Sequence, residues 1–563
     1  MQRKWIFPEL PDPLAAGRLL RDMEVPPFLA SLLIKRGFLQ IDRAQGFLNP
    51  RLASLQPPEI LPGMPAAAGR VLEAVRRGER IVLYGDYDVD GVTSLALLSR
   101  ALRAFGAGVE CFLPHRVEEG YGLSPAGVER CIDMHRPSLL LAVDCGTTSV
   151  REIDTLRRRG VDVIVLDHHE PSPQGLPDCV AVVNPKLGDD FHYLCSAGVV
   201  FKLVHALAKL SPCEGLDLKQ YLDLVALATV ADIVPLTGEN RIFVRHGLRQ
   251  MAVSRWAGIR ALMKVAGVSA PVRGSDVGFR LGPRINAAGR LGPAQEALQL
   301  LTTDDPDEAS HLADGLDSHN RERQNVERAV AVEAEEWVEK NHRPERDATI
   351  VAGQREWHVG VIGVVASRVM RRHHRPTFIV GFDGSGVGKG SGRSIEGLSL
   401  VTLLERCAGH LDKFGGHDMA AGVTVSEDAF PAFRQAFEEA ARELATGDVL
   451  TPRLHLDAEI ELHDLGESVM EFQDMLEPFG QGNAQPVFFT RAVSPAGAPR
   501  PMKEKHLKID FPVGRRRMPA VFFNATLDSL PRPPWDVAYT LDWNSWQGRT
   551  EVQMRIVEIR RAA

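Results

Sequence analysis

The strongest constraint on the fold is an alternation of short apolar runs with helical segments that begins near residue 80. Apolar runs occupy 81–84, 109–113, 139–143 and 163–166, and a helix-like stretch covers 95–105. Short β-rich runs separated by helices are typical of a doubly wound parallel sheet. Acidic or imidazole side chains follow the first, third and fourth runs. Because ligands bind at the carboxyl ends of strands in open α/β sheets, these side chains are expected to converge.

A chain of 563 residues is too long for one compact core, so several domains are expected. A charged segment over about 305–342 has no proline after Pro306 and predicts a long helix between two lobes. A glycine-rich α/β segment follows, and short alternating runs from about 452 predict a small β-barrel. The predicted boundaries are an N-terminal extension over 1–60, a catalytic domain over 61–300, the connecting helix over 301–345, a smaller α/β domain over 346–447 and the barrel over 448–563.

Composition excludes several classes of protein. No stretch approaches the roughly 20 apolar residues of a membrane span, and the first residues lack the apolar run of a signal peptide, so a cytoplasmic location is expected. The seven cysteines are never spaced as Cys-x-x-Cys, which predicts neither a disulfide framework nor a structural zinc site. The net charge of -7 argues against coating nucleic acid by bulk charge, although a local basic channel is compatible with it.

Three carboxylates lie on alternate residues directly after the first apolar run, at Asp86, Asp88 and Asp90. Left bare, they would repel one another strongly, so the spacing calls for a cation or a set of hydrogen-bond donors. An EF-hand is excluded, because the twelfth position of such a loop is Leu97 where a glutamate is required. Binding of a metal ion is the simplest interpretation.

Further acidic and imidazole side chains follow the later runs. Asp144 follows one run, Asp167, His168 and His169 follow the next, and Asp232 lies near the end of a helical segment. A histidine with several aspartates suits Mn²⁺, with Mg²⁺ as the competitor, and the lack of thiolates disfavours zinc. Any one of these residues alone is more often a helix cap or a structural histidine, but their joint placement at strand ends reverses that balance.

This combination resembles the DHH phosphoesterase superfamily. The resemblance is carried by Asp-x-Asp at 88–90, Asp144, Asp-His-His at 167–169 and Asp232. The sequence at 84–94, 116–123 and 282–290 is similar to the superfamily's branch of single-strand-specific DNA exonucleases. Members with small substrates usually have a histidine where Tyr84 stands, so Asp86 is the expected alternative ligand.

The resemblance implies two divalent cations, preferably Mn²⁺ with Mg²⁺ as the second choice, that share Asp144 as a bridge in two-metal hydrolysis. It implies catalytic roles for His169, Asp144 and Asp90, with His169 acting on the transition state or in proton transfer instead of as a ligand. The implied metal ligands are Asp86, Asp88, Asp90, Asp144, His168 and Asp232.

The second lobe carries motifs at 357–368, 390–394 and 414–417 that resemble the companion DHHA1 domain, which contacts substrate in the superfamily. Glycines let backbone N–H groups approach a phosphate, and Arg393 offers a bidentate fork. A Walker A loop near Lys389 is excluded by Asp383 and Gly390 at its key positions, so ATP is not expected. The substrate-binding residues implied for the two lobes are Arg116, Arg284, Asn286, Arg290, His358, Ser391, Arg393 and His417.

The tail motif at 478–488 resembles the OB fold of the same branch, with Lys503, Lys505, Lys508 and Trp543 as candidate strand contacts. The resemblance implies processive 5′ to 3′ degradation of single-stranded DNA to 5′-mononucleotides in recombination and repair. Single-strand-binding protein and repair helicases are candidate partners, and no membrane is expected. Two alternatives stay open: a DHH-type oligoribonuclease or cyclic-dinucleotide phosphodiesterase, and a non-catalytic single-strand-binding replication subunit.

Overall fold

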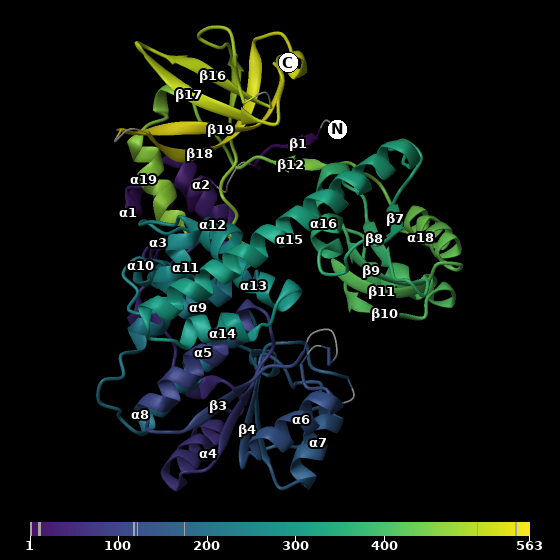
Figure 1. Ribbon diagram of the computed structural model, residues 1–563. Coiled ribbons are helices and arrows are strands. Elements are labelled where there is room, and N and C mark those ends of the chain that lie inside the picture. Colours follow the sequence, from purple (N-terminus) through teal and green to yellow (C-terminus); the bar gives the residue numbers. More distant parts are fainter. Residues whose placement is uncertain are drawn as a thin grey trace. The chain divides into compact units, whose positions relative to one another are not determined.

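The structure of the protein is a computed structural model that describes residues 3–9, 13–115, 119–120, 122–173, 175–503, 505–546 and 549–562. The chain forms two compact units (Figure 1). Unit 1 comprises Met1–Ile6, Arg290–Gly292 and Asp317–Leu454. Unit 2 comprises Phe7–Gly289, Pro293–Leu316 and His455–Ala563.

Unit 2 contains a parallel sheet with the strand order β3-β2-β4-β5-β6. Leu83 faces one core and its neighbours Val82 and Tyr84 face another, so both faces of the sheet are covered. Helices α4, α5 and α8 pack on the first face, and α6 and α7 on the second. The predicted doubly wound sheet is confirmed. The elements are β2 (Ile81–Tyr84), β3 (Val109–Phe112), β4 (Leu139–Val143), β5 (Asp162–Leu166), β6 (Ala181–Val183), α4 (Met64–Arg77), α5 (Val89–Ala104), α6 (Pro125–His135), α7 (Val150–Arg158) and α8 (Ser196–Leu210).

A helical layer continues this domain and shares the first of these cores. A π-helical turn, Val277–Leu281, joins two of its helices and leads into the segment that carries Arg284 and Asn286. The helices are α9 (Leu222–Ala231), α10 (Gly238–Met251), α11 (Ala257–Ala266), α12 (Gly274–Asp276), α13 (Gly282–Leu291) and α14 (Gln295–Thr302).

The N-terminal helices share a hydrophobic core with the C-terminal β domain, although the two segments lie at opposite ends of the chain. That domain is a mixed sheet in the order β13-β14-β18-β19-β17-β16-β15. Arg241 of α10 stacks on Phe47 at 3.8 Å and donates hydrogen bonds to the carbonyls of Met475 and Leu476. The elements are α1 (Pro13–Met23), α2 (Pro27–Lys35), α3 (Ile41–Leu48), α19 (Glu467–Leu476), β13 (Ala458–Glu459), β14 (Phe488–Val493), β15 (Arg500–Met502), β16 (His506–Val513), β17 (Arg516–Phe523), β18 (Trp535–Trp546) and β19 (Arg549–Arg561).

Unit 1 is a smaller α/β domain that includes the part of the expected long helix, α15 (Pro306–Asn341), from Asp317 onward. Helices α15 and α16 pack on one face of its sheet, and α17 and α18 pack on the other. Strand β1 (Lys4–Ile6) pairs with β12 (Arg453–His455) in a separate two-stranded sheet. The remaining elements are β7 (Ile350–Arg355), α16 (Ile362–His373), β8 (Thr377–Phe382), β9 (Val387–Arg393), α17 (Leu400–Arg406), β10 (Lys413–His417), β11 (Ala420–Ser426) and α18 (Phe430–Leu444). Among the described residues, no helix is both long and apolar enough to cross a bilayer.

Candidate metal centre

The loop after β2 presents the three alternating aspartates at the start of α5. Asp88 caps this helix and accepts a hydrogen bond of 3.0 Å from the Gly91 backbone N–H. Asp90 is buried and accepts backbone hydrogen bonds from Ser196 (2.7 Å) and Ala197 (2.9 Å), at the start of α8. Two helix N-termini therefore stabilise negative charge on this loop.

Gly91 makes this tight loop possible. A Cβ at this position would lie 2.5 Å from the carbonyl oxygen of Asp86, well inside contact distance. The Gly91→Ala variant is expected to displace the aspartates, to lower the free energy of unfolding by about 1–3 kcal/mol and to weaken binding of divalent cations. Urea unfolding and Mn²⁺ titration measure both effects. Gly46→Ala is the control, because a Cβ there would meet no described atom within 4 Å beyond its neighbours and the backbone of its own helix. Unchanged cation binding by Gly91→Ala would contradict the expectation.

Asp144 directly follows β4 and adopts a left-handed backbone conformation with φ of 62°. Aspartate tolerates this region better than most residues, because its short side chain hydrogen-bonds locally. The Asp144 carboxylate is buried and accepts a hydrogen bond of 2.8 Å from the Ser196 hydroxyl. The start of α8 thus holds both Asp90 and Asp144.

Asp167 follows β5 and orients the two histidines after it. Its carboxylate accepts the backbone N–H of Thr147 at 2.9 Å and of His168 at 2.7 Å, and lies 2.7 Å from His169 Nδ1. Burial raises the pKa of Asp167, but its bonds to His169 and Thr147 outweigh burial and hold the pKa below the usual range. For His169 burial lowers the pKa, and the bond to Asp167 reverses this, so the pKa is raised.

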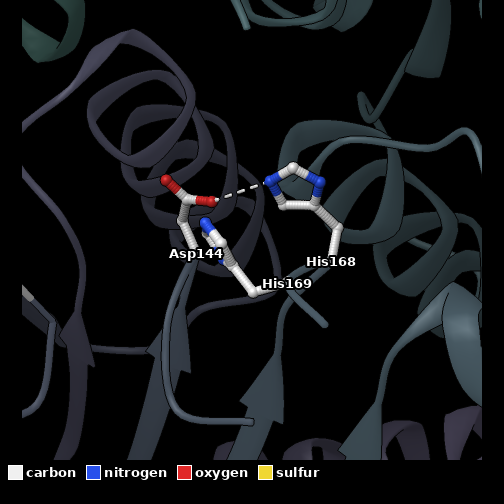
Figure 2. Close-up of side chains that lie close together, drawn as sticks. All are labelled: Asp144, His168 and His169. Carbon is white, nitrogen blue, oxygen red and sulfur yellow. Dashed lines mark ion pairs between the residues drawn. The ribbon is translucent and has the colours of Figure 1, made fainter. Parts of the chain in front are cut away.

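Carboxylates from these loops lie around the imidazole of His168. Figure 2 shows the carboxylate of Asp144 directed at this ring, with His169 beside it. Its Nε2 lies 3.5 Å from Asp144 Oδ1, 3.5 Å from Asp232 Oδ2 and 3.8 Å from Asp90 Oδ2. Asp232 reaches the cluster from the C-terminal end of α9. Within the described part of the chain, three groups of side chains have ligand atoms within 4.8 Å of one another: Asp144 with His168 and His169, Asp90 with His168 and Asp232, and Asp86 with Asp88 and Asp144. All six residues predicted as metal ligands, together with His169, therefore lie in one cluster.

The electrostatics of the cluster fit a divalent cation. Burial, and then the neighbouring carboxylates, raises the pKa of Asp90 to about 6 and of Asp232 to about 9, and raises that of Asp144 as well. Asp232 Oδ2 is buried and accepts no hydrogen bond from the residues that the structure describes. Burial lowers the pKa of His168 to about 3, which keeps the imidazole neutral, as a metal ligand must be. An oxygen-rich set with one imidazole suits Mn²⁺ or Mg²⁺.

Several residues that support the cluster were not identified from the sequence. Ser196 and Ala197 hold Asp90 and Asp144, as described above. Asn184, fully buried after β6, donates hydrogen bonds to Thr147 Oγ1 (3.0 Å) and to the His169 carbonyl (2.8 Å). One sequence feature could have drawn attention to Ser196, because a serine at the start of an apolar helical run such as 196–210 is typical of a helix N-terminus.

Removing the Ser196 hydroxyl tests this support. The Ser196→Ala variant is expected to bind Mn²⁺ about 10- to 100-fold more weakly, because Asp144 loses the donor that orients it. Calorimetric titration with Mn²⁺ measures the affinity. Ser31→Ala is a matched control, since the Ser31 hydroxyl bonds a backbone carbonyl on the exposed side of helix α2. Equal affinity in Ser196→Ala and the wild type would show that this hydrogen bond does not position a ligand.

In unit 1, predicted substrate-binding residues gather at the start of α16. Arg290 Nη1 donates to the Gly360 carbonyl at 2.8 Å, and the Gly360 N–H donates to His358 Nδ1 at 3.1 Å. Arg393 Nη1 donates to Ser391 Oγ at 3.1 Å. A helix N-terminus beside an arginine and a hydroxyl group is a suitable site for a phosphate group.

Two further observations define this phosphate-type cluster of Arg290, His358, Ser391, Arg393 and His417. Gly363 of α16 lies close to the end of β9, because a Cβ on Gly363 would be 3.0 Å from Ser391 Oγ and 3.2 Å from Arg393 Nη2. His417 pairs with Ala420, which pairs in turn with Arg393, so His417 and Arg393 share a sheet face. His358 and His417 are both exposed.

The other predicted substrate contacts lie elsewhere. Arg284 and Asn286 belong to α13 in unit 2, and Arg284 donates a hydrogen bond to the Arg280 carbonyl. Helix α13 packs on the aspartate loop, because a Cβ on Gly289 would lie 3.0 Å from the Tyr87 carbonyl oxygen. Arg116 lies outside the described residues.

The candidate strand contacts of the β domain differ in exposure. Lys503, Lys505 and Lys508 are exposed on or beside β16. Trp543 is half-buried, and its indole N–H donates to Asp474 at 3.2 Å. The edge of Trp543 is therefore already occupied by a contact within the domain.

A parallel sheet whose strand ends carry this aspartate and histidine cluster, together with the smaller α/β domain, defines a phosphoesterase of the DHH class. Residues 80–229 match the model of the DHH family, N-terminal domain, and residues 347–443 match that of the DHHA1 domain. Residues 456–558 match the RecJ OB domain. The chain belongs to the RecJ family of single-stranded-DNA-specific exonucleases.

Curated relatives of that name match nearly the whole chain. The Escherichia coli protein is 36% identical over 95% of this chain and 96% of its own length. The Thermus thermophilus protein is 37% identical over 99% and 79%, and the Bacillus subtilis protein 35% identical over 97% and 69%. The expected fold and enzyme class, a hydrolase of phosphodiester bonds, are therefore confirmed, and the alternatives of a small-substrate phosphodiesterase or a non-catalytic subunit are not favoured.

Solved structures support the same assignment. The crystal structure of Thermus thermophilus RecJ in complex with Mn²⁺ covers 100% of this chain with a TM-score of 0.85 and 34% identity, and the chain covers 80% of it. The structure of the same protein with Mg²⁺ gives a TM-score of 0.79 and 32% identity. These relatives hold divalent cations, in agreement with the ligand set described above.

Proposed function

We propose that this chain is a metal-dependent 5′ to 3′ exonuclease that hydrolyses single-stranded DNA to 5′-mononucleotides in recombination and repair. The observation that carries the proposal is the convergence of aspartates from separate loops on His168. Divalent cations bound there would polarise the phosphodiester oxygens and stabilise the charge that develops on them. The names of the full-length relatives support single-stranded DNA as the substrate.

Two cations are proposed, with Mn²⁺ preferred over Mg²⁺. Two ligand groups that share no residue support this number: Asp90, His168 and Asp232 form one, and Asp86, Asp88 and Asp144 form the other. Asp144 is also close to His168, so its carboxylate is suited to bridge the two positions. The imidazole favours Mn²⁺, since Mg²⁺ prefers oxygen ligands alone.

His169 and Asp167 would take part in proton transfer and in positioning, without binding a cation directly. His169 is held by Asp167, and this bond outweighs burial and raises the pKa of the imidazole. We propose that His169 donates a hydrogen bond or a proton to the phosphodiester as negative charge builds up, as a general acid does. Asp167 would serve as its positioning residue, and Asp90 and Asp144 would act through the cations.

The 5′ to 3′ polarity of degradation is proposed to arise from the phosphate-type cluster of unit 1. Arg393 is half-buried, and burial followed by the neighbouring charge of Arg371 lowers its pKa. Two guanidinium groups near a hydroxyl and a helix N-terminus favour a dianionic terminal phosphate over a bridging one. Arg284 and Asn286 of α13 would contact backbone phosphates next to the aspartate loop.

End-labelled strands test the function. The purified protein with Mn²⁺ is expected to release labelled mononucleotides from the 5′ end of a long single strand, to leave a duplex intact, and to lose activity in EDTA. Strands with a 5′-phosphate should be cut faster than strands with a 5′-hydroxyl, and Arg393→Gln should remove this preference. Arg355→Gln is the control, because Arg355 is exposed and pairs with Glu427. Turnover restricted to dinucleotides or cyclic dinucleotides would overturn the assignment.

Partners and location are proposed on the basis of the family alone. We propose that single-strand-binding protein and repair helicases supply the strand in the cytoplasm. Co-purification with each candidate in the presence and absence of single-stranded DNA would separate a direct protein contact from a shared substrate.

A further inference from the structure

Unit 2 exposes two large apolar side chains around a single cavity. Phe279 is 79% exposed and Ile233 is 69% exposed, and both line a cavity of about 450 Å³. Phe479, Gln481 and Gln485 of the segment before β14 form another part of its wall. Large apolar side chains at this exposure lose the free energy that burial would provide, so a cavity that displays two of them is suited to an apolar ligand surface.

Irregular backbone conformations place Ile233 and Phe279 at the cavity. Ile233 directly follows the metal-cluster residue Asp232 and has a φ of 60°, a conformation that is unfavourable for a β-branched residue. Phe279 is the middle residue of the π-helical turn Val277–Leu281. Strained dihedrals and π-helical turns are both found more often at functional sites than elsewhere. The wall of the cavity therefore includes two irregular backbone segments, and one of them directly follows the metal-cluster residue Asp232 in the sequence.

The polar wall of the cavity does not favour a phosphate. Arg273 lines it, but its guanidinium lies 3.9 Å from Glu477 and 4.0 Å from Asp542, which also line it. Two carboxylates beside one arginine leave no positive excess for an anion. A flat group with an apolar face and a polar edge fits this lining, since the face meets Phe279 and Ile233 and the edge meets charged and amide groups.

We propose that this cavity binds an unpaired nucleobase of the single strand that enters the metal centre, with the base stacked on Phe279 and in contact with Ile233. The inference rests on the proposed function and adds a specificity site to it. A base inside a duplex is stacked on both faces and paired along its edge, so only a single strand can present a free face to Phe279. The cavity would thus contribute to selection of single strands.

Strands with one abasic position test the inference. A fluorescent 5′-phosphorylated oligothymidylate is compared with a series in which one tetrahydrofuran residue replaces each of the first nucleotides in turn. Affinity is measured by anisotropy in EDTA, and kcat/KM with Mn²⁺. For the wild type, one abasic position is expected to reduce affinity roughly tenfold. Phe279→Ala should bind the complete strand roughly tenfold more weakly and show no further loss at that position.

Matched variants separate stacking from general damage. Phe279→Trp keeps an aromatic face and should retain wild-type affinity, and Ile233→Ala should reproduce part of the loss in Phe279→Ala. Val253→Ala is the control, because Val253 is similarly exposed after the end of α10 but does not line the cavity. Equal sensitivity of Phe279→Ala and the wild type to every abasic position would overturn the inference. Failure of the proposed function is distinct, since the wild type would then release no mononucleotides.

Discussion

Replacing Asp144 by asparagine is expected to reduce hydrolysis of single-stranded DNA by about three orders of magnitude or more while stabilising the metal-free protein. Activity falls because, among the residues that the structure describes, Asp144 lies in two of the three groups of potential metal ligands. The metal-free protein gains stability because the neutral amide relieves repulsion with Asp86 and Asp90. Asparagine also tolerates the left-handed backbone of this residue, whereas alanine would add strain.

Opposite effects on activity and stability distinguish a metal ligand from a structural residue. Thermal unfolding in EDTA and in Mn²⁺, beside mononucleotide release, measures both. Asp223→Asn is a matched control, because Asp223 is fully buried and has a pKa raised to about 6, but it accepts hydrogen bonds from Ser254 and Leu224 outside the cluster. If Asp144→Asn retained activity, or if it destabilised the protein in EDTA as a lost structural contact would, the assignment of Asp144 would be wrong.

Divalent cations are expected to stabilise the protein, and to do so more strongly as pH rises. In the metal-free protein, the pKa values of Asp90 and Asp232 are raised to about 6 and about 9, so the folded state binds more protons than the unfolded state. The stabilisation that comes from protonating these two carboxylates is complete below about pH 4 and is lost as the pH rises through their pKa values. A cation replaces the protons, and at a concentration of about a thousand times Kd it adds about 4 kcal/mol.

Melting temperatures recorded from about pH 5 to pH 9 with EDTA or Mn²⁺ check this linkage. The difference between the two curves should widen with pH, and proton release should accompany Mn²⁺ binding near pH 7. The Asp232→Asn variant should flatten the pH dependence in EDTA, because the carboxyl group of Asp232 has the higher of the two pKa values. A stabilisation by Mn²⁺ that is constant over this range would place the cation outside the carboxylate cluster.

The sheet and the ligands could be predicted because their signals are local in the sequence. Leu83 and Leu141 belong to short apolar runs that are buried on both faces, and such runs lead directly to Asp86 and Asp144. The order of strands in an open parallel sheet then brings their carboxyl ends together. The long helix α15 was equally visible from its charge and its lack of proline after the first residue.

Other features depend on tertiary packing that no local pattern encodes. Ser196 reaches Asp144 across 52 residues of sequence, and Asn184 meets Thr147 across 37. Phe279 is exposed in a π-helical turn, and no local pattern in the sequence indicated this turn. Similarly, α2 and β14 share a core although they lie at opposite ends of the chain, and a contact such as Phe28 with Phe488 has no sequence signature.

Anomalous diffraction from crystals of this protein grown with Mn²⁺ tests the central claim most directly. The account predicts two anomalous peaks within coordination distance of the cluster, one near Asp90, His168 and Asp232 and the other near Asp86 and Asp88, with Asp144 between them. Crystals of Asp144→Asn should lose at least one peak. Peaks bound away from these residues, or none at a Mn²⁺ concentration that supports hydrolysis, would contradict the assignment of this cluster as the metal centre.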